Sequence, residues 1–398
     1  MSLLAALARR YGTPLYVYSA DIVREHYRIW RESFTRPALV CYALKANSCR
    51  AVAAVLAREG AGADIVSGGE LRRACAAGFA PARIVFSGVG KSEEEMAAGL
   101  RAGVKAFNVE SSDELDALAR VAGRLGLRAP VSVRLNPDID ARTHPHIATG
   151  RADNKFGVEI AEARALYRRA ARDHRLRVTG VQCHIGSQIT SAAPYRRAAV
   201  AVAALAKSLK RGGIALGFAD MGGGFGIRYK DETPLEPEAL VKTLEEAFAE
   251  QPELELLIEP GRSLVADAGL LLTKVLYRKQ TSKRRFVVVD GAMTDLPRPA
   301  LYGAWHPMEV VAPRRGKKTM ADVVGPVCES GDFLARRRLL PPLERGDLLA
   351  VLKAGAYGFA MSSQYNSRPR AAEALVDGGK ARLVRRRETD RDLTRGEL

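Results

Sequence analysis

The feature that most limits how this chain can fold is a regular alternation of short apolar runs and amphipathic segments from Ala38 to Ile258. The runs are rich in β-branched and aliphatic residues, and they cover residues 38–44, 63–66, 83–86, 104–109, 131–135, 178–184, 216–221 and 254–258. Between them apolar residues recur with helical spacing, as in Leu240, Val241 and Leu244. Eight strands that alternate with helices predict a (β/α)8 barrel, whose functional residues lie at the carboxyl ends of the strands.

The last third of the chain follows a different pattern, because helical spacing is mostly lost after residue 267. Apolar runs predict strands there, and turns such as Asp377-Gly378-Gly379 separate them. The expected strands cover residues 271–277, 286–289, 323–327, 348–352 and 383–384. A short helix and a strand at 15–18 precede the barrel, and 398 residues suffice for two domains. We expect an α/β plus β protein, with the barrel at 21–267 and a β domain at 1–20 and 268–398.

The net charge of +17 raises the question of a nucleic-acid partner. The basic clusters at 314–318, 336–338 and 385–387 are dispersed, lack interleaved aromatic residues, and accompany no nucleic-acid-binding motif. Solvated faces explain them better, and a basic surface also attracts an anionic substrate. We expect no nucleic-acid partner.

The cysteines and histidines indicate neither a metal site nor an oxidising compartment. The five cysteines form no CxxC pair, and the six histidines form no HExxH motif. An odd, scattered set of thiols is typical of a reduced cytoplasmic protein. The first residues lack the pattern of a secretory signal, and the longest apolar run, 198–206, is far shorter than the roughly 18 residues of a membrane span. We expect a cytoplasmic protein with no metal and no membrane partner.

Polar residues at four of the expected strand ends could form a site for pyridoxal phosphate (PLP). Lys45 carries an amine that can bind an aldehyde, although a lysine reaching solvent is the commoner explanation. The glycine-rich segment 222–226 could cradle a phosphate or form only a turn. Glu259 could keep a pyridine nitrogen protonated or pair with Arg262. His184 could stack on the ring or be a hydrogen-bonded core residue.

Taken in order, segments along the whole chain resemble the fold-type III PLP-dependent decarboxylases, and among them the branch that acts on diaminopimelate. The matching segments are 42–47, 64–71, 143–147 with 155–157, 184–188, 222–224, 259–262, 298–302, 328–332, 355–358 and 365–369. The resemblance implies an alanine racemase-like architecture, in which a PLP-binding barrel is joined to a β-sandwich or Greek-key barrel domain. Two departures are Thr294, where asparagine is usual, and Ala148, where a hydroxyl residue is usual.

The resemblance also implies roles for individual residues. Lys45 would be the Schiff-base lysine, His184 would stack on the ring, and Cys328 would be the catalytic proton donor. The cofactor-binding set that it implies is Lys45, Asp64, Ser67, His184, Gly222, Gly223, Gly224, Glu259, Pro260, Gly261, Arg262 and Tyr357. The substrate-binding set is Arg262, Arg298, Tyr302, Glu329 and Tyr357. In such enzymes Cys328 and Glu329 come from the neighbouring subunit, so the β domain would contribute to a homodimer with shared active sites.

The expected function is that of a carboxy-lyase, which converts meso-2,6-diaminopimelate to L-lysine and carbon dioxide in the last step of lysine biosynthesis. Arg298 and Tyr302 with Cys328-Glu329 indicate a substrate with a distal carboxylate. A related decarboxylase of ornithine, lysine or arginine shares the fold and is the main alternative. A racemase or a PLP carrier without catalytic activity fits less well, because the first would lack the 328–332 segment and the second would lack the β domain.

Overall fold

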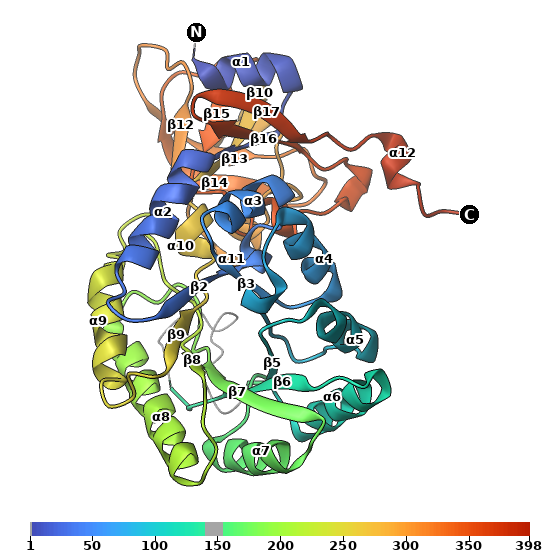
Figure 1. Ribbon diagram of the computed structural model, residues 1–398. Coiled ribbons are helices and arrows are strands. Elements are labelled where there is room, and N and C mark those ends of the chain that lie inside the picture. The colour runs from blue at the N-terminus through green and yellow to red at the C-terminus, as the bar shows by residue number, and fades with distance from the viewer. Residues whose placement is uncertain (1, 140–153) are drawn as a thin grey trace. The chain divides into compact units, whose positions relative to one another are not determined.

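The computed structural model describes residues 2–139 and 154–398, and these residues divide into two compact units (Figure 1). The barrel unit comprises Arg24–Arg228 and Glu232–Ser263. The β unit comprises Met1–Val23, Tyr229–Asp231 and Leu264–Leu398. These limits differ by a few residues from the expected 21–267 and 268–398, and the short segment Tyr229–Asp231 belongs to the β unit although it lies within the barrel sequence.

The barrel unit contains a closed parallel barrel of eight strands, which confirms the predicted fold class. The strands are β2 (Ala38–Ala43), β3 (Gly62–Ile65), β4 (Ile84–Phe86), β5 (Ala106–Val109), β6 (Ala129–Leu135), β7 (Leu176–Cys183), β8 (Phe218–Asp220) and β9 (Glu255–Ile258). Pairing of β2 with β9, from Ala38 opposite Leu256 to Val40 opposite Ile258, closes the barrel. Every expected run forms a strand, with ends shifted by a few residues.

Helices lie around the outside of these strands (Figure 1). They are α2 (Ala20–Glu32), α3 (Arg50–Arg58), α4 (Gly68–Ala77), α5 (Glu93–Ala102), α6 (Ser112–Leu125), α7 (Ile160–Arg172), α8 (Ala192–Arg211), α9 (Pro237–Ala247) and the short α10 (Arg262–Val265). Ser67, Ser92 and Ser111 cap the first turns of α4, α5 and α6, since each serine hydroxyl accepts a backbone N–H. Ser67 and Ser111 start α4 and α6 close to the preceding strand, whereas a longer loop separates β4 from α5.

The interior of the barrel is apolar in one layer and polar in the next. Leu39, Cys41, Val85, Ala106, Phe218 and Leu257 pack together as the apolar layer. Gly180 leaves room for it, because a Cβ there would overlap the ring of Phe218. Side chains two residues apart on a strand point to the same face, so the next inward positions are Asn108, Gln182, Asp220 and Glu259. These four side chains are buried, and they form a polar layer at the carboxyl ends of the strands.

The β unit is built on a mixed nine-stranded sheet with the order β14-β13-β11-β10-β1-β16-β17, while β15 pairs with β10 and β12. Its strands are β1 (Leu15–Ser19), β10 (Gly269–Gln280), β11 (Arg285–Val289), β12 (Met308–Val310), β13 (Thr319–Val324), β14 (Phe333–Leu340), β15 (Leu348–Val351), β16 (Ala372–Asp377) and β17 (Lys380–Arg385). This sheet confirms the predicted β domain. The sequence analysis missed β12, β14 and β16, because β12 is short and three arginines interrupt the apolar residues of β14.

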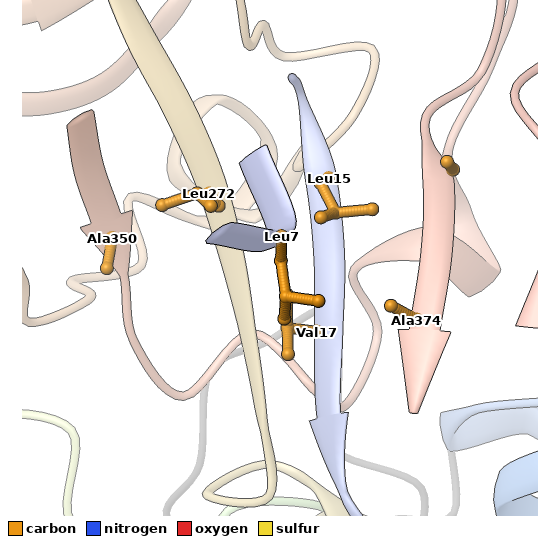
Figure 2. Packing of buried hydrophobic residues seen from close by; sticks show 7 residues of the cluster. Leu7, Leu15, Val17, Leu272, Ala350 and Ala374 are labelled. Atoms are coloured by element: carbon orange, nitrogen blue, oxygen red, sulfur yellow. The ribbon is translucent and has the colours of Figure 1, made fainter. Parts of the chain in front are cut away.

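The core of this sheet includes residues from both ends of the chain, as Figure 2 shows. Leu7 of α1 (Leu3–Tyr11) packs with Leu15 and Val17 of β1, Leu272 of β10 and Ala374 of β16. The N-terminal strand is therefore central, with β10 antiparallel on one side and β16 parallel on the other.

No helix in residues 2–139 or 154–398 is long and apolar enough to cross a membrane.

We expect Leu272→Ala to lower the free energy of unfolding of the β unit by about 2–5 kcal/mol, the range for deleting a fully buried leucine side chain. Leu272 is 0% exposed, whereas Leu339 on β14 is 60% exposed. Urea denaturation of the full chain measures the effect. The control Leu339→Ala should change stability by about 0.5 kcal/mol or less. Equal losses in the two variants would contradict the packing described here.

Candidate active site

Lys45 lies in a short 3-10 helix, η1 (Leu44–Ala46), directly after β2. Its Nζ is 2.8 Å from Oδ2 of Asp64, the inward residue of β3, and the Asp64 side chain is fully buried. The Lys45 side chain is 37% exposed, so this amine is held by a buried carboxylate yet remains accessible. Such an amine at the carboxyl end of a barrel strand can react with an aldehyde.

His184 follows β7 and is held as a neutral ring. Its Nδ1 accepts the backbone N–H of Gly223 at 3.0 Å, which leaves the ring proton on Nε2. Burial lowers the pKa of His184 well below its usual value, and the positive charges of Arg134 and Lys45 lower it further. A flat, uncharged imidazole in a fixed tautomer is suited to stacking on an aromatic ring.

The glycines after β8 are required by close packing within the barrel unit. A Cβ on Gly223 would overlap the carbonyl oxygen of Glu259, and one on Gly224 would overlap that of Gly186. Gly222 and Gly224 also have positive φ angles of 66° and 90°, which favour glycine. This loop therefore fits between the loops that follow β7 and β9, and no other residue type could replace these glycines without a shift of the backbone.

Two of the three glycine N–H groups in this segment are already bonded within the barrel unit. The Gly222 N–H donates to Asp220 Oδ1 at 2.9 Å, and the Gly223 N–H donates to His184. In the described residues, the Gly224 N–H has no such acceptor. One backbone N–H of this triplet, rather than three, is thus available to a phosphate in this structure.

Glu259 lies just past β9, is 3% exposed, and contacts two polar side chains. Gln182 Nε2 donates to its two carboxylate oxygens at 3.2 and 3.4 Å. The carboxyl of Asp220 lies within hydrogen-bonding reach of it. Burial, followed by the neighbouring charge of Asp220, raises the pKa of Glu259 well above its usual value. A carboxyl that holds a proton here can share that proton with a ring nitrogen.

Three other predicted cofactor residues shape the backbone around Lys45. The Pro260 carbonyl accepts the N–H of Ala43 at 3.2 Å, which joins the turn after β9 to the end of β2. A Cβ on Gly261 would lie 3.0 Å from the Cβ of Ala46, so this turn packs directly on η1. Ser67 caps α4 by accepting the N–H of Glu70 at 3.2 Å. These contacts place Glu259 close to the segment that carries Lys45.

The sequence analysis did not single out the buried charges around this site. Arg134 on β6 pairs with Glu110 at 3.2 Å, and both side chains are less than 9% exposed. Glu110 also accepts the N–H groups of Gly88 and Gly157, at 3.1 and 3.0 Å. Arg262 donates from Nη2 to Ser187 Oγ at 3.1 Å. Glu110 and Arg134 were not predicted, because their pairing joins two different strand ends.

The remaining predicted residues belong to the β unit, where Arg298 begins α11 (Arg298–Tyr302). Arg298 is 6% exposed, and its Nη1 is 2.7 Å from Nε2 of His306. His306 Nδ1 lies 3.0 Å from the Leu352 carbonyl, so Nδ1 carries the proton and Nε2 accepts from the arginine. The ring of Tyr229 lies 4.5 Å below the guanidinium. His306 and Tyr229, neither of them predicted, therefore orient Arg298.

Cys328 and Glu329 are exposed on a loop that Asp332 holds together. The buried Asp332 carboxylate accepts the N–H of Val327 and the N–H of Met293, each at 2.7 Å. The Cys328 N–H donates to Asn366 Oδ1 at 2.8 Å. An exposed thiol and an exposed carboxylate on a braced loop are accessible to a second molecule.

Tyr302 and Tyr357 are half-buried in the β unit. Tyr357 has a φ of 57°, a backbone conformation that tyrosine rarely adopts and that often occurs at functional sites. The predicted segment 143–147 and Ala148 lie outside the described residues. In residues 2–139 and 154–398, no cluster of three or more His, Cys, Asp or Glu side chains could hold a metal ion.

Comparison with known proteins gives the same relationship along the whole chain. The sequence pattern of "Pyridoxal-dependent decarboxylase, pyridoxal binding domain" matches residues 20–266. The diaminopimelate decarboxylase of Pseudomonas aeruginosa is 52% identical over 395 residues, which cover 99% of this chain and 95% of that protein.

Solved structures agree with this relationship. The Helicobacter pylori diaminopimelate decarboxylase, in complex with L-lysine, superposes with a TM-score of 0.95 at 44% identity over 98% of both chains. A lysine/ornithine decarboxylase of Vibrio vulnificus has the same fold, with a TM-score of 0.82 at 24% identity over 94% of this chain and 97% of that one. With such identity over nearly its full length, this chain belongs to the pyridoxal-dependent decarboxylases and, within them, to the diaminopimelate decarboxylase family.

Proposed function

We propose that this chain converts meso-2,6-diaminopimelate to L-lysine and carbon dioxide, the last step of lysine biosynthesis, with PLP held by Lys45. The observation that carries the proposal is the arrangement at the carboxyl end of the barrel. There an accessible amine, a neutral imidazole and a buried carboxyl with a raised pKa lie at the ends of β2, β7 and β9. Relatives at about half identity over nearly the full length are diaminopimelate decarboxylases, which supports the choice of substrate.

The residues of the barrel unit fit PLP group by group. Lys45 would hold the aldehyde carbon, and the His184 ring would lie against the pyridine face. Glu259 would face the ring nitrogen, and the Gly224 N–H would bind the phosphate. When bound, PLP supplies an electron-poor ring that accepts the electron pair left as the bond to the carboxylate breaks.

The chain's own side chains would manage the protons of the reaction. Glu259 keeps a proton at the ring nitrogen, which requires the buried environment that raises its pKa. The Asp64 carboxylate balances the charge of the Lys45 amine while that amine is protonated. When the amine reacts, the buried Asp64 carboxylate stays beside it. After carbon dioxide leaves, Cys328 would donate the thiol proton to the α-carbon.

Arg298 is the residue that we assign to the distal carboxylate of diaminopimelate. Its Nη1 is bound by His306 and its face by Tyr229, so the guanidinium is fixed before substrate arrives. Fixed donors lose little conformational entropy on binding and therefore discriminate between substrates. Ornithine, lysine and arginine have no second carboxylate, so the same site would bind them without satisfying Arg298.

The active form that we propose is a homodimer in which Cys328 and Glu329 complete the site of the neighbouring subunit. Their exposure on the loop braced by Asp332 supports this arrangement. We also propose a cytoplasmic location, since all five cysteines are unpaired thiols.

The central experiment measures carbon dioxide released from four amino acids by the purified chain with PLP. We expect turnover of meso-diaminopimelate and little from ornithine, lysine or arginine. Lys45→Ala should abolish turnover and the visible absorbance of bound PLP. Lys105→Ala is the matched control, because Lys105 pairs with Glu255 at 2.7 Å, and both residues lie at the amino ends of their strands. Preferred turnover of ornithine, or a PLP adduct that borohydride still reduces in Lys45→Ala, would reject the proposal.

We expect Arg298→Ala to weaken use of diaminopimelate by about 2–4 kcal/mol of transition-state binding, the range for a charged partner left unpaired. PLP affinity should be unchanged. Steady-state kinetics and a PLP titration measure the two effects, and Arg278→Ala is the control, since Arg278 is an exposed arginine paired with Glu344. Loss of PLP with unchanged substrate preference would instead place Arg298 in the cofactor site.

The shared site predicts that two inactive variants restore each other. Lys45→Ala and Cys328→Ala, mixed under conditions of subunit exchange, form about half heterodimers by random pairing, and about a quarter of all sites are then intact. Activity should recover toward that fraction. Mixing Lys45→Ala with Glu259→Gln should give no recovery, because both changes lie in the barrel unit. If the first mixture also stays inactive although exchange is demonstrated, Cys328 acts within its own chain or not at all.

A further inference from the structure

Two buried carboxylic acids meet at the ends of adjacent strands in the barrel. Asp220 ends β8 and is 0% exposed, while Glu259 follows β9 and is 3% exposed. Asp220 pairs in register with Leu257, so Glu259, two residues further along, points to the same interior face. The two carboxyls lie within hydrogen-bonding reach of each other. An ionised carboxylate cannot donate a hydrogen bond, so a hydrogen bond between two carboxyl groups requires one of them to be protonated.

The neighbours of each carboxyl show which one holds that proton. Asp220 Oδ1 accepts the backbone N–H of Gly222 at 2.9 Å, a bond that favours the charged form. Asp220 Oδ2 is buried, and within residues 2–139 and 154–398 it has no hydrogen-bond donor when both carboxyls are ionised. A proton on the Glu259 carboxyl would supply that donor. Burial raises the pKa of Asp220 to about 7, whereas it raises the pKa of Glu259 well above the usual value, in agreement with a protonated Glu259.

Other ionisable groups around the pair do not supply this proton. Asp64 on β3 adds a negative charge, and Lys45 on η1 adds a positive charge that is paired with Asp64. The thiols of Cys41 on β2 and Cys183 on β7 remain protonated, because burial raises their pKa values. Two further groups face the pair. Arg134 is paired with Glu110, and the Nδ1 of His184 accepts the N–H of Gly223.

We propose that Asp220 is a positioning residue for Glu259, which it orients and keeps protonated so that Glu259 delivers its proton to the pyridine nitrogen of PLP. The inference rests on the proposed role of Glu259. The transfer breaks the O–H bond of Glu259 and forms an N–H bond at the ring. The net charge of the three groups is −1 before and after the transfer, because the new Glu259 carboxylate balances the new positive charge on the ring. The Asp220 carboxylate thus stabilises the protonated ring through Glu259, and the Gln182 amide supports the Glu259 carboxylate that results.

Infrared spectroscopy of the full-length protein, prepared without PLP and labelled with 13C in the glutamate carboxyls, tests where the proton lies. At about pH 8 an acid with a pKa of about 7 is mostly ionised. We expect a protonated-carboxyl band that moves with the glutamate label and disappears in Glu259→Gln. The band should weaken or vanish in Asp220→Asn, since the adjacent charge is gone. Asp295→Asn is the matched control, because burial also raises the pKa of Asp295 to about 7.

The infrared result can overturn the inference in two ways. An unchanged band in Asp220→Asn means that the Glu259 proton does not depend on Asp220. If that variant does not fold, aspartate labelling of the unmutated protein decides the question, because a protonated band that moves with the aspartate label places the proton on the wrong residue.

A second measurement links the pair to PLP and tests the role of Glu259 separately from that of Asp220. Reconstitution with 15N-labelled PLP reports the protonation of the ring nitrogen by NMR, and Asp220→Asn should shift this signal toward the unprotonated form. One unit of pKa corresponds to about tenfold in the protonated ratio, so we expect a loss in kcat of about tenfold or more with KM little changed. An unchanged signal in Glu259→Gln rejects the role of Glu259. A change in Glu259→Gln without one in Asp220→Asn rejects the role of Asp220 alone.

Discussion

The burial of charged and protonated groups at the carboxyl end of the barrel is the constraint on which this site depends. An isolated carboxylate in such an environment costs several kcal/mol, so each one must find a cation, a donor or a proton. Asp64 has Lys45, Glu110 has Arg134, and Asp220 has the Gly222 N–H with the Glu259 proton. Two of these contacts hold Lys45 and Glu259, the side chains to which the proposed reaction assigns the aldehyde and the ring nitrogen of PLP.

The backbone around these groups leaves little freedom for them to move. The loop after β8 can fit between its neighbours only because Gly223 and Gly224 have no Cβ. That fit brings the Gly223 N–H to His184 and so selects the tautomer of the ring. A glycine segment that looks like a phosphate loop in sequence thus also serves to orient a histidine, and only part of it is available to a ligand.

The β unit uses the same principle for different groups. Arg298 is held by the neutral ring of His306, which is itself fixed by the Leu352 carbonyl. Asp332 collects backbone N–H groups and shapes the loop that exposes Cys328. Buried tyrosines stabilise the sheet of this unit, such as Tyr18, whose hydroxyl donates to Glu373 at 2.7 Å. In each unit a buried partner orients a group that the proposed reaction requires.

The sequence alone determined the number and order of the barrel strands. Local backbone geometry sets the spacing of apolar residues, which is two in a strand and about 3.6 in a helix. It also placed Lys45, His184 and Glu259 at strand ends. Only the tertiary structure decided which of these groups share protons. Gln182 meets Glu259 across 77 residues of sequence, and Arg298 meets His306 in a loop without periodicity. Strand β14 was missed for a related reason, since three successive arginines interrupt its apolar residues and it forms only by pairing with β13. Pairing between remote segments leaves no local pattern, so protonation and orientation at this site follow from the fold rather than from any single segment.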